Sequence, residues 1–418
     1  MILIHSNYTM AQLDHFVVQD VIGGEISTQS VGIPLYIAVL AKDTMNNTVT
    51  DFTGTVNITS TGILSAGGGT TENFLNGALD SHMVIFSNAG NFTITATNTD
   101  GPETGTSNSF LVNNPVPTMT SISPMSKTVG ESGFVLTVNG TNFVDSSIVQ
   151  FNGSNRTTTF VSSTQLIAAI LQSDLTTKGT FPITVSNPSP GGGTSNVQPF
   201  TVNNPIVNVK LLLQGPYNGS GMNTTLNNDG LIPLNQPYNT PPWNYAGTES
   251  VTVIPNNVAD WVLVELRSGT TSSTTAARRA AFITSDGFLV DTDGTSPVEF
   301  FNASAGNYYI VIWHRNHLAI MSANTIVVND TTTLYDFTTG VSKYFGNDAK
   351  SLHGGTFGMY AGDFSVDGFI DAADFVGPDN DVFLSGYRRS DLNMDGFIDG
   401  SDFVYPDNNV FKGTNVPN

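Results

Sequence analysis

The chain has 418 residues, of which 39% are hydrophobic and only 11% are charged, whereas ordinary soluble domains carry about 25% charged residues. It contains 41 Gly, and Ser, Thr and Asn are frequent in every stretch. Because these residues disfavour helices and suit strands and turns, the composition excludes a mainly helical protein. The apolar content is sufficient for several small cores, which excludes global disorder, and the length allows two to four domains of about 100–200 residues.

The net charge of −20 arises from 34 acidic and 14 basic residues. A nucleic-acid binder needs a basic face to neutralise phosphates, so we expect no nucleic-acid partner. The absence of cysteine excludes disulfides, iron–sulfur clusters and thiol chemistry. No apolar run approaches the ~20 residues of a membrane helix, so we expect no membrane insertion.

The first residues, Met1–Ile4, are too short an apolar run for the core of a signal peptide. We therefore expect either that a signal was removed or that the sequence starts inside a longer chain. The remaining features are typical of an exported protein. We expect a bacterial protein that is extracellular or on the cell surface.

Residues 13–114 show short apolar runs between turn clusters, at residues 31–39, 54–59, 82–86 and 91–96. Strands at this spacing predict a β-sandwich, and the pattern is similar to bacterial immunoglobulin-like repeats. Residues 1–12 form an N-terminal extension that would supply an extra strand to a neighbouring molecule.

Residues 115–204 carry a more specific pattern. Its characteristic stretches lie at residues 117–124, 129–130, 134–143, 147–153 and 179–188. The segment resembles an IPT/TIG domain, which implies a small immunoglobulin-like sandwich. The sequence Val-Asn-Asn-Pro occurs at both of its ends, at residues 112–115 and 202–205. Since proline keeps the preceding residue extended, these joints predict stiff linkers and a rod of successive domains.

Residues 205–340 form a third segment. Its strand candidates are residues 207–213, 250–254, 261–267, 280–283, 308–314 and 325–328. Much of the segment resembles a hemagglutinin-like C-terminal module of bacterial surface proteins. The resemblance implies another β-sandwich and no particular activity.

Residues 341–418 comprise a linker and an internal repeat, in which residues 363–376 align with residues 391–404 at an offset of 28. Residues 362–418 contain 11 Asp and no Glu. Calcium takes about six to eight oxygen ligands, and a loop supplies them from positions 1, 3, 5, 7, 9 and 12 with Gly at position 6. Both copies have this pattern, so the repeat predicts two calcium ions.

The apolar residue at position 8 of each loop, Ile370 or Ile398, would anchor it in the core. The glycines at position 6 are Gly368 and Gly396. Because an amide carbonyl is a better calcium ligand than a hydroxyl, we expect the second site to bind more tightly. The predicted ligands are Asp363, Ser365, Asp367, the Phe369 carbonyl, Asp371 and Asp374 in the first loop, and Asp391, Asn393, Asp395, the Phe397 carbonyl, Asp399 and Asp402 in the second.

The paired loops resemble a type I dockerin, which implies calcium binding by a module of about 50 residues. Pro378 and Pro406 follow the loops closely, so any helix after each loop should be one to two turns long. Positions 10 and 11 help dockerins choose a partner, and they differ between the copies, being Ala372-Ala373 and Gly400-Ser401. Docking onto a cellulosomal cohesin is therefore not expected, and whether the module has a cohesin-like partner stays open.

We identify no catalytic residues. His314 and His317 would lie on opposite faces of a strand, which favours a structural role over a metal pair. No nucleophile elbow, phosphate loop or catalytic carboxylate pair stands out. Tyr238, Trp243 and Tyr245, in a proline-rich loop, would stack against sugar rings or seal a sandwich edge.

The sequence thus predicts a mainly β protein of tandem immunoglobulin-like β-sandwiches with a small C-terminal dockerin-like module holding two calcium ions. We expect a non-catalytic, extracellular protein with a structural or adhesive role. One form of this hypothesis is that the chain is a subunit of a surface fibre. The expected partners are other copies of the chain, neighbouring surface proteins or glycans. The alternative is a carbohydrate-binding accessory region of a secreted enzyme.

Overall fold

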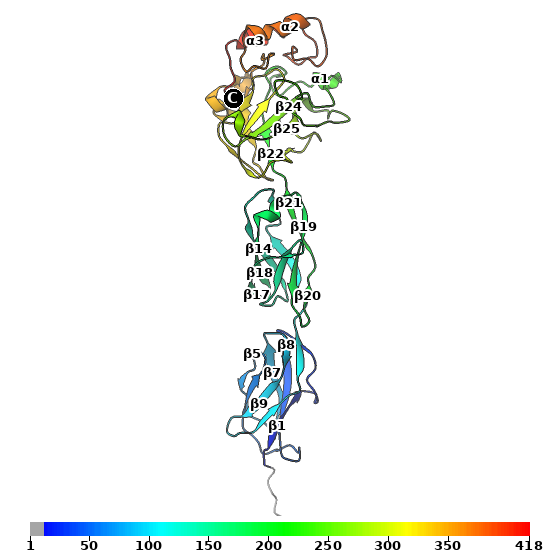
Figure 1. The fold of residues 1–418 in the computed structure, drawn as a ribbon, viewed down its shortest axis with the longest axis vertical. Coiled ribbons are helices and arrows are strands. Elements are labelled where there is room, and N and C mark those ends of the chain that lie inside the picture. Colours follow the sequence, from blue (N-terminus) through cyan, green and yellow to red (C-terminus); the bar gives the residue numbers. More distant parts are fainter. Residues whose placement is uncertain (1–11) are drawn as a thin grey trace, which may run out of the picture. The chain divides into compact units, whose positions relative to one another are not determined.

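The computed structural model describes residues 12–418 (Figure 1). These residues form two compact units. The first comprises residues up to 125 together with 133–171 and 180–200, and the second comprises 126–132, 172–179 and 201–418. The domain boundaries inferred from the sequence stay a prediction, and most of the expected donor strand, residues 1–11, lies outside the described residues.

Residues 13–114 fold into three antiparallel or mixed sheets. The first has the order β1 (His15–Asp20), β3 (Leu35–Lys42), β7 (Ala78–Phe86) and β5 (Leu64–Ala66). The second has the order β10 (Thr104–Thr106), β9 (Ile94–Asn98), β4 (Val56–Ser60) and β6 (Gly69–Thr70). The third has the order β2 (Gln29–Ser30), β11 (Phe110–Asn113) and β8 (Gly90–Phe92).

The alternation of apolar and polar residues explains why these strands form sheets with one buried face. In β4, for example, Val56 and Ile58 are buried while Asn57 and Thr59 are exposed. The inward residues of the sheets pack as one core with stacked and edge-on phenylalanines such as Phe86 and Phe92.

The segment that contains residues 115–204 has two further sheets. One has the order β12 (Thr118–Ser123), β14 (Phe134–Thr141), β18 (Gln165–Ile170) and β17 (Thr158–Ser162). The other has the order β13 (Ser126–Thr128), β21 (Gln198–Asn203), β19 (Gly179–Asn187), β15 (Ile148–Phe151) and β16 (Ser154–Asn155), and β20 (Gly193–Thr194) pairs with β19. The architecture is therefore mainly β, as predicted.

The largest sheet of the second unit lies at residues 258–328. Its order is β26 (Leu289–Val290), β25 (Thr275–Thr284), β24 (Val258–Arg267), β28 (Gly306–Trp313) and β29 (Ile320–Met321), and β30 (Ile326–Val328) also pairs with β28. All ten residues of β24 are buried. Since successive side chains point to opposite faces, both faces of this sheet are covered at β24.

Small two-stranded sheets frame this one. They are β22 (Ile206–Val207) with β27 (Val298–Glu299), β23 (Val209–Lys210) with β31 (Tyr335–Asp336), and β32 (Lys350–Ser351) with β33 (Phe357–Gly358). The strand predicted at residues 207–213 is confirmed only at its start, and the one at 250–254 is wrong. There the backbone pairs briefly with residues 234–236, and Pro255 ends the extension because it cannot donate to a ladder.

The C-terminal repeat lacks long helices. Helix α1 (Thr225–Asn228) precedes the sheet, and α2 (Val376–Asp381) and α3 (Val404–Asn409) follow the two Asp-rich loops at one end of the second unit (Figure 1). The six-residue length of α2 and α3 confirms the one to two turns that Pro378 and Pro406 predicted. Each proline sits in a first helical turn, where its missing N–H has no partner to lose.

We predict that Leu266→Ala destabilises the second unit by about 2–5 kcal/mol, because Leu266 is fully buried in β24 and its truncation leaves a cavity. The measurement is the free energy of unfolding in urea. Val327→Ala on β30 is the control, since Val327 is 60% exposed, and it should change the free energy by less than about 1 kcal/mol. Equal effects of the two substitutions would contradict the assignment of β24 to the core.

Candidate functional site

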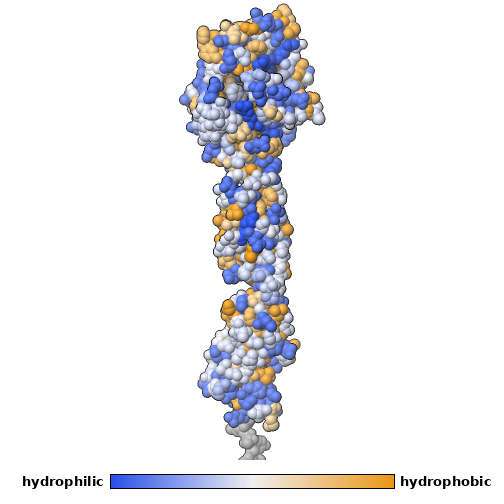
Figure 2. Space-filling view, viewed as in Figure 1, coloured by the Kyte–Doolittle hydropathy of each residue, from blue (hydrophilic) through white to orange (hydrophobic). Residues whose placement is uncertain are grey.

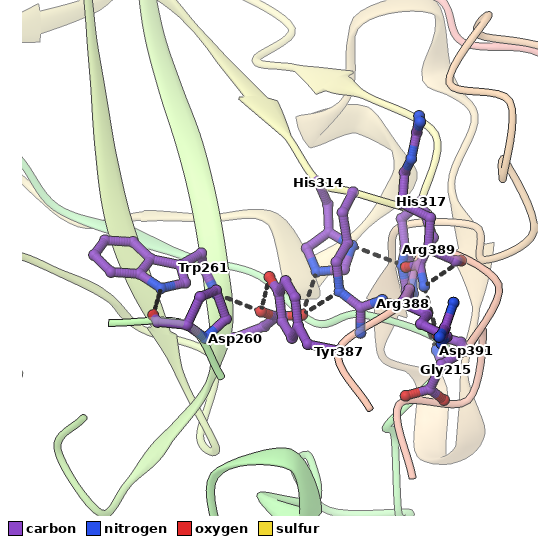
Figure 3. Close-up of polar contacts among 12 residues, drawn as sticks. Gly215, Asp260, Trp261, His314, His317, Tyr387, Arg388, Arg389 and Asp391 are labelled. Atoms are coloured by element: carbon purple, nitrogen blue, oxygen red, sulfur yellow. Dashed lines mark hydrogen bonds and ion pairs between the residues drawn. The ribbon is translucent and has the colours of Figure 1, made fainter. Parts of the chain in front are cut away.

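A buried carboxylate on β24 organises the polar centre of the second unit (Figure 3). Asp260 has no exposed surface. It accepts hydrogen bonds from Arg315 Nε at 2.9 Å, His314 Nε2 at 3.2 Å and the Tyr387 hydroxyl at 2.6 Å. Tyr387 lies in the C-terminal repeat, so this carboxylate joins the repeat to the sheet.

Charge compensation keeps this group ionised. Burial alone would raise the pKa of Asp260, but the guanidinium of Arg315, with His314 and Tyr387, lowers it to about 2. The Arg315 side chain is also buried, and its guanidinium lies 4.4 Å from the centre of the Tyr387 ring. Removal of either charge would leave the other without its counter-ion in the interior.

The two histidines form a neutral pair. Strand β28 ends at Trp313, so the expected alternation across a strand does not apply, and the Nδ1 atoms of His314 and His317 lie 3.0 Å apart. His314 donates through Nε2 to Asp260, which leaves its Nδ1 as an acceptor, and His317 Nε2 accepts from the Gly215 N–H at 3.1 Å. The N–H at His317 Nδ1 is therefore shared between His314 Nδ1 and the Asn316 Oδ1 atom, which lies 2.8 Å away. Burial lowers both pKa values. The fully partnered rings support a structural role.

The segment that leads into the second Asp-rich loop is fixed by backbone contacts to this centre. Asn316 Nδ2 donates to the carbonyls of Arg389, at 3.2 Å, and Asp391, at 2.6 Å, and the Arg315 guanidinium donates to the carbonyl of Arg388. Figure 3 shows Asp391 and Gly215 close to Arg388 and Arg389. Asp391, at position 1 of the second loop, is therefore bound to the part of the second unit that contains the β24 sheet, which we call the sheet domain.

Further bonds hold the repeat along its length. Tyr405 donates to the Gly215 carbonyl at 3.0 Å, and Asn409 Nδ2 donates to Gln214 Oε1 at 2.7 Å. Near the C-terminus, Arg267 donates to the Pro417 carbonyl at 2.6 Å. The repeat and the sheet domain thus share one continuous polar and apolar interior.

The second loop is closed by hydrogen bonds from its own backbone to two of its aspartates. Asp391 accepts from the N–H groups of Asp395, at 3.1 Å, and Gly396, at 3.0 Å. Asp402 accepts from Leu392 N at 2.7 Å and Asp399 N at 2.9 Å. Burial raises the pKa of Asp391 to about 6 although the nearby Arg315 opposes this.

The first loop repeats this frame but leaves two oxygen atoms without partners. Asp374 accepts from Ser365 N and Asp371 N, both at 2.9 Å. Asp363 Oδ1 and Ser365 Oγ are closed to solvent and make no hydrogen bond within residues 12–418. Burial, with the neighbouring charges of Asp374 and Asp367, raises the pKa of Asp363 to about 7. A bound cation would give the two unpaired oxygens a partner and would reduce the repulsion between the neighbouring carboxylates.

Two sequence expectations about the loops are confirmed. Gly368 and Gly396 have φ values of 87° and 89°, which a residue with a Cβ rarely adopts, and Ile370 and Ile398 are fully buried. Within residues 12–418, however, no three acidic or histidine side chains converge as a ready-made metal cluster. The assignment of calcium to Asp363, Ser365, Asp367, Phe369, Asp371 and Asp374, and to Asp391, Asn393, Asp395, Phe397, Asp399 and Asp402, stays a prediction.

The three aromatic residues that were expected either to stack against sugar rings or to seal a sandwich edge are largely buried. Tyr238 has no exposed surface, and its hydroxyl donates to the Trp261 carbonyl at 2.7 Å. Trp243 is 8% exposed and packs edge-on against Tyr238, while Tyr245 donates to Glu249 Oε1 at 2.7 Å. Tyr238 therefore has no face to offer a sugar ring, and the three side chains do not form a flat platform.

Sequence reasoning missed Asp260, Arg315, Asn316 and Tyr387. One signal was available, because an aspartate inside the otherwise apolar stretch 258–264 must find a partner when that stretch is buried. The identity of that partner was not encoded locally, since Arg315 and Tyr387 are 55 and 127 residues away.

Comparison with known proteins supports one segment. Residues 117–202 match the sequence model of a family described as the IPT/TIG domain, which confirms the resemblance of this segment. The match leaves the other three segments uncovered, so their resemblances stay predictions. No curated protein matches the sequence.

Many solved structures match the chain at low similarity. The adhesin InvE of Yersinia pseudotuberculosis is 14% identical over 68% of this chain and 95% of its own, with a TM-score of 0.29. A 1.5-MDa bacterial ice-binding adhesin is 14% identical over 77% and 97%, with a TM-score of 0.22. The Bacteroides ovatus SGBP-B, in complex with a mixed-linkage heptasaccharide, is 11% identical over 65% and 70%, with a TM-score of 0.18. Similarity at this level carries no information about ligands or partners.

We predict that Asp260→Asn destabilises the second unit by about 3–5 kcal/mol, because it leaves Arg315 buried without its counter-ion. The pKa of Asp260 is lowered from its usual 3.8, so its contribution is complete above about pH 4 and is lost as the pH falls from 3.8 towards 2. Unfolding free energies measured from pH 5 to pH 2 should show this loss in the wild type and not in the variant.

Asp407→Asn is the control, since Asp407 is exposed, and it should stay within about 0.5 kcal/mol of the wild type. A fully stable Asp260→Asn protein, with the wild-type pH profile, would show that the ion pair does not support the unit.

Proposed function

We propose that this chain is a non-catalytic structural or adhesive protein of a bacterial cell surface or its surroundings, and that two calcium ions complete its C-terminal repeat. The observation that carries the proposal is the pair of unpartnered buried oxygens, Asp363 Oδ1 and Ser365 Oγ, at positions 1 and 3 of a duplicated Asp-rich loop. An extracellular setting supplies the millimolar calcium that such loops use.

The donor chemistry favours calcium over other metals. Every predicted ligand is an oxygen, from carboxylates, an amide, a hydroxyl or a backbone carbonyl, and the chain has no cysteine. Hard cations prefer such ligands, whereas zinc and copper sites use histidine or thiolate. The ring nitrogens of His314 and His317 are already hydrogen-bonded to each other, to Asp260 and to Gly215.

Calcium in the repeat would stabilise the sheet domain as well as the loops. Asp391 begins the second loop, and its carbonyl is bound by Asn316 from the sheet domain. An ion that holds the loop therefore also holds the segment on which Tyr387 reaches Asp260. At about a hundred times its dissociation constant, a ligand of this kind adds about 2.7 kcal/mol of stability.

The two sites should differ in affinity. Arg315 lies close enough to Asp391 for their charges to interact, and this cation competes with a metal in the second loop. The first loop instead has two oxygens without hydrogen-bond partners within residues 12–418. We therefore expect the first site to bind calcium more tightly, which reverses the order that Ser365 and Asn393 alone predicted.

A structural or adhesive role requires contacts with other molecules. The repeat exposes apolar residues, among them Phe383 at 78% and Phe411 at 79%, and Figure 2 shows hydrophobic surface among hydrophilic surface at this end of the second unit. Copies of the chain and neighbouring surface proteins are the proposed partners. Assembly into a fibre through residues 1–12 stays a prediction. Over residues 12–418, no helix is long and apolar enough to span a bilayer.

Calorimetric titration with calcium tests the proposal. The wild-type chain should bind two ions, and Asp367→Ala and Asp395→Ala should each bind one, because each removes the position-5 carboxylate of one loop. Asp379→Ala, at an exposed position outside the loops, is the matched control and should still bind two. Chelation should lower the urea midpoint of the wild type.

Retention of two ions by both position-5 variants, or no heat of binding in millimolar calcium, would contradict the proposal. If Asp367→Ala abolished the weaker phase of binding and not the tighter one, the expected order of the sites would be wrong.

A further inference from the structure

Residues 411–417, which we call the strap, lie between the first Asp-rich loop and the sheet domain. On the loop side the strap pairs with positions 6 to 8 of the loop as a short antiparallel segment. Three backbone hydrogen bonds make this pairing, from Phe411 N to Ile370 O at 2.9 Å, from Ile370 N to Lys412 O at 2.8 Å and from Thr414 N to Gly368 O at 2.8 Å.

The pairing surrounds one of the predicted calcium ligands. Phe369 lies at position 7, where a calcium loop supplies a backbone carbonyl. The strap binds the carbonyls of the two residues beside it, Gly368 and Ile370. The contact at Gly368 is close, since a Cβ at this position would lie 2.8 Å from the Thr414 methyl group. An ion in the first loop and the strap would therefore constrain the same three residues.

The other end of the strap is anchored in the sheet domain. Val416 is 7% exposed and packs in a small apolar cluster with Val311 of β28, Ala319 and Met321. The Thr414 hydroxyl donates to the Ala319 carbonyl at 2.7 Å. The strap is thus held by the first loop on one side and by the sheet domain on the other.

The second loop has an equivalent attachment at the 28-residue offset of the repeat. Residues 383–386 pair with it through hydrogen bonds from Phe383 N to Ile398 O at 2.9 Å and from Gly386 N to Gly396 O at 3.0 Å. The next residue, Tyr387, donates to Asp260. Each loop is therefore joined to the sheet domain by its own segment, and the two segments reach different parts of that domain.

We propose that calcium in the first loop controls the strap. The bound ion holds residues 368–370 in the conformation that pairs with residues 411–414, and loss of the ion releases the strap from Ala319 and from the cluster around Val416. The inference rests on the proposed function, since it needs an ion in the first loop. Because coupling between two sites is reciprocal, weakening the strap must also lower the affinity of the first loop for calcium.

Amide hydrogen exchange of the full chain in millimolar calcium tests the control of the strap. Asp367→Ala and Asp395→Ala are a matched pair, since each removes the position-5 carboxylate of one loop. Asp367→Ala should accelerate exchange in residues 411–417 and 319–321 about tenfold or more and leave residues 383–387 within about twofold of the wild type. Asp395→Ala should have the opposite pattern. Equal acceleration of the strap by both variants, or a strap that stays protected in Asp367→Ala, would overturn the inference.

Calorimetric titration with calcium tests the reciprocal effect. It uses the Asp395→Ala chain, in which only the first site should remain. Adding Val416→Ala, which removes the apolar anchor, should lower the affinity of that site about fivefold or more. Thr414→Val, which removes only the hydroxyl that donates to Ala319, should act in the same direction. Val404→Ala is the control, since the same truncation is made at a residue that is 50% exposed, and it should change the affinity less than about twofold.

A thermal unfolding scan establishes that each variant is folded, and the number of ions bound by the wild type is recorded first. Two bound ions, with a first-site affinity that neither strap variant lowers, would remove only this inference. No bound ions would remove the proposed function itself.

Discussion

The buried ion pair between Asp260 and Arg315 is the constraint on which the second unit depends. Placing two charges in an interior is unfavourable unless both are paired and hydrogen-bonded. Here the two charges are paired with each other and each is hydrogen-bonded, although Arg315 Nη2 has no hydrogen-bond partner within residues 12–418. Asp260 receives three side-chain donors, and Arg315 contacts Asp260, the Tyr387 ring and a backbone carbonyl of the repeat. Because these partners come from β24, from the turn after β28 and from the C-terminal repeat, the pair is satisfied only when all three are assembled. The sheet and the repeat are therefore expected to form and unfold together.

Because of this arrangement, the Asp-rich loops affect the stability of more than their own turns. Each loop concentrates carboxylates whose mutual repulsion opposes folding, and one of them begins on the segment that docks against Asn316. A cation in the repeat would thus act on the docked segment, and through it on the buried ion pair. The same geometry places Asp363 and Asp367 on the wall of a cavity that Arg267 and Arg278 also line. The proposed metal binding and the docking of the repeat would in this way depend on one interface within the second unit.

The features predicted correctly from the sequence are those encoded within a few residues. Alternating apolar residues specified strands such as β4, Gly368 and Gly396 specified the sharp turns of the loops, and Pro378 and Pro406 limited the helices that follow. The failures concern contacts that depend on the path of the folded backbone and not on the local sequence pattern. Tyr238 reads as an amphipathic loop residue, yet its hydroxyl is taken by the Trp261 carbonyl in the core. His314 and His317 read as alternating strand residues, yet the strand ends one residue earlier and their rings meet. No local sequence pattern indicates that Asp260 pairs with Arg315 and Tyr387.

Amide hydrogen exchange of the full chain, with and without calcium, tests most directly whether the repeat and the sheet domain act as one body. The account predicts that chelation accelerates exchange in the loop segment 391–402 and also in β24 and residues 314–317, which have no proposed calcium ligands of their own. Acceleration confined to residues 363–402, with β24 and residues 314–317 unchanged, would contradict it.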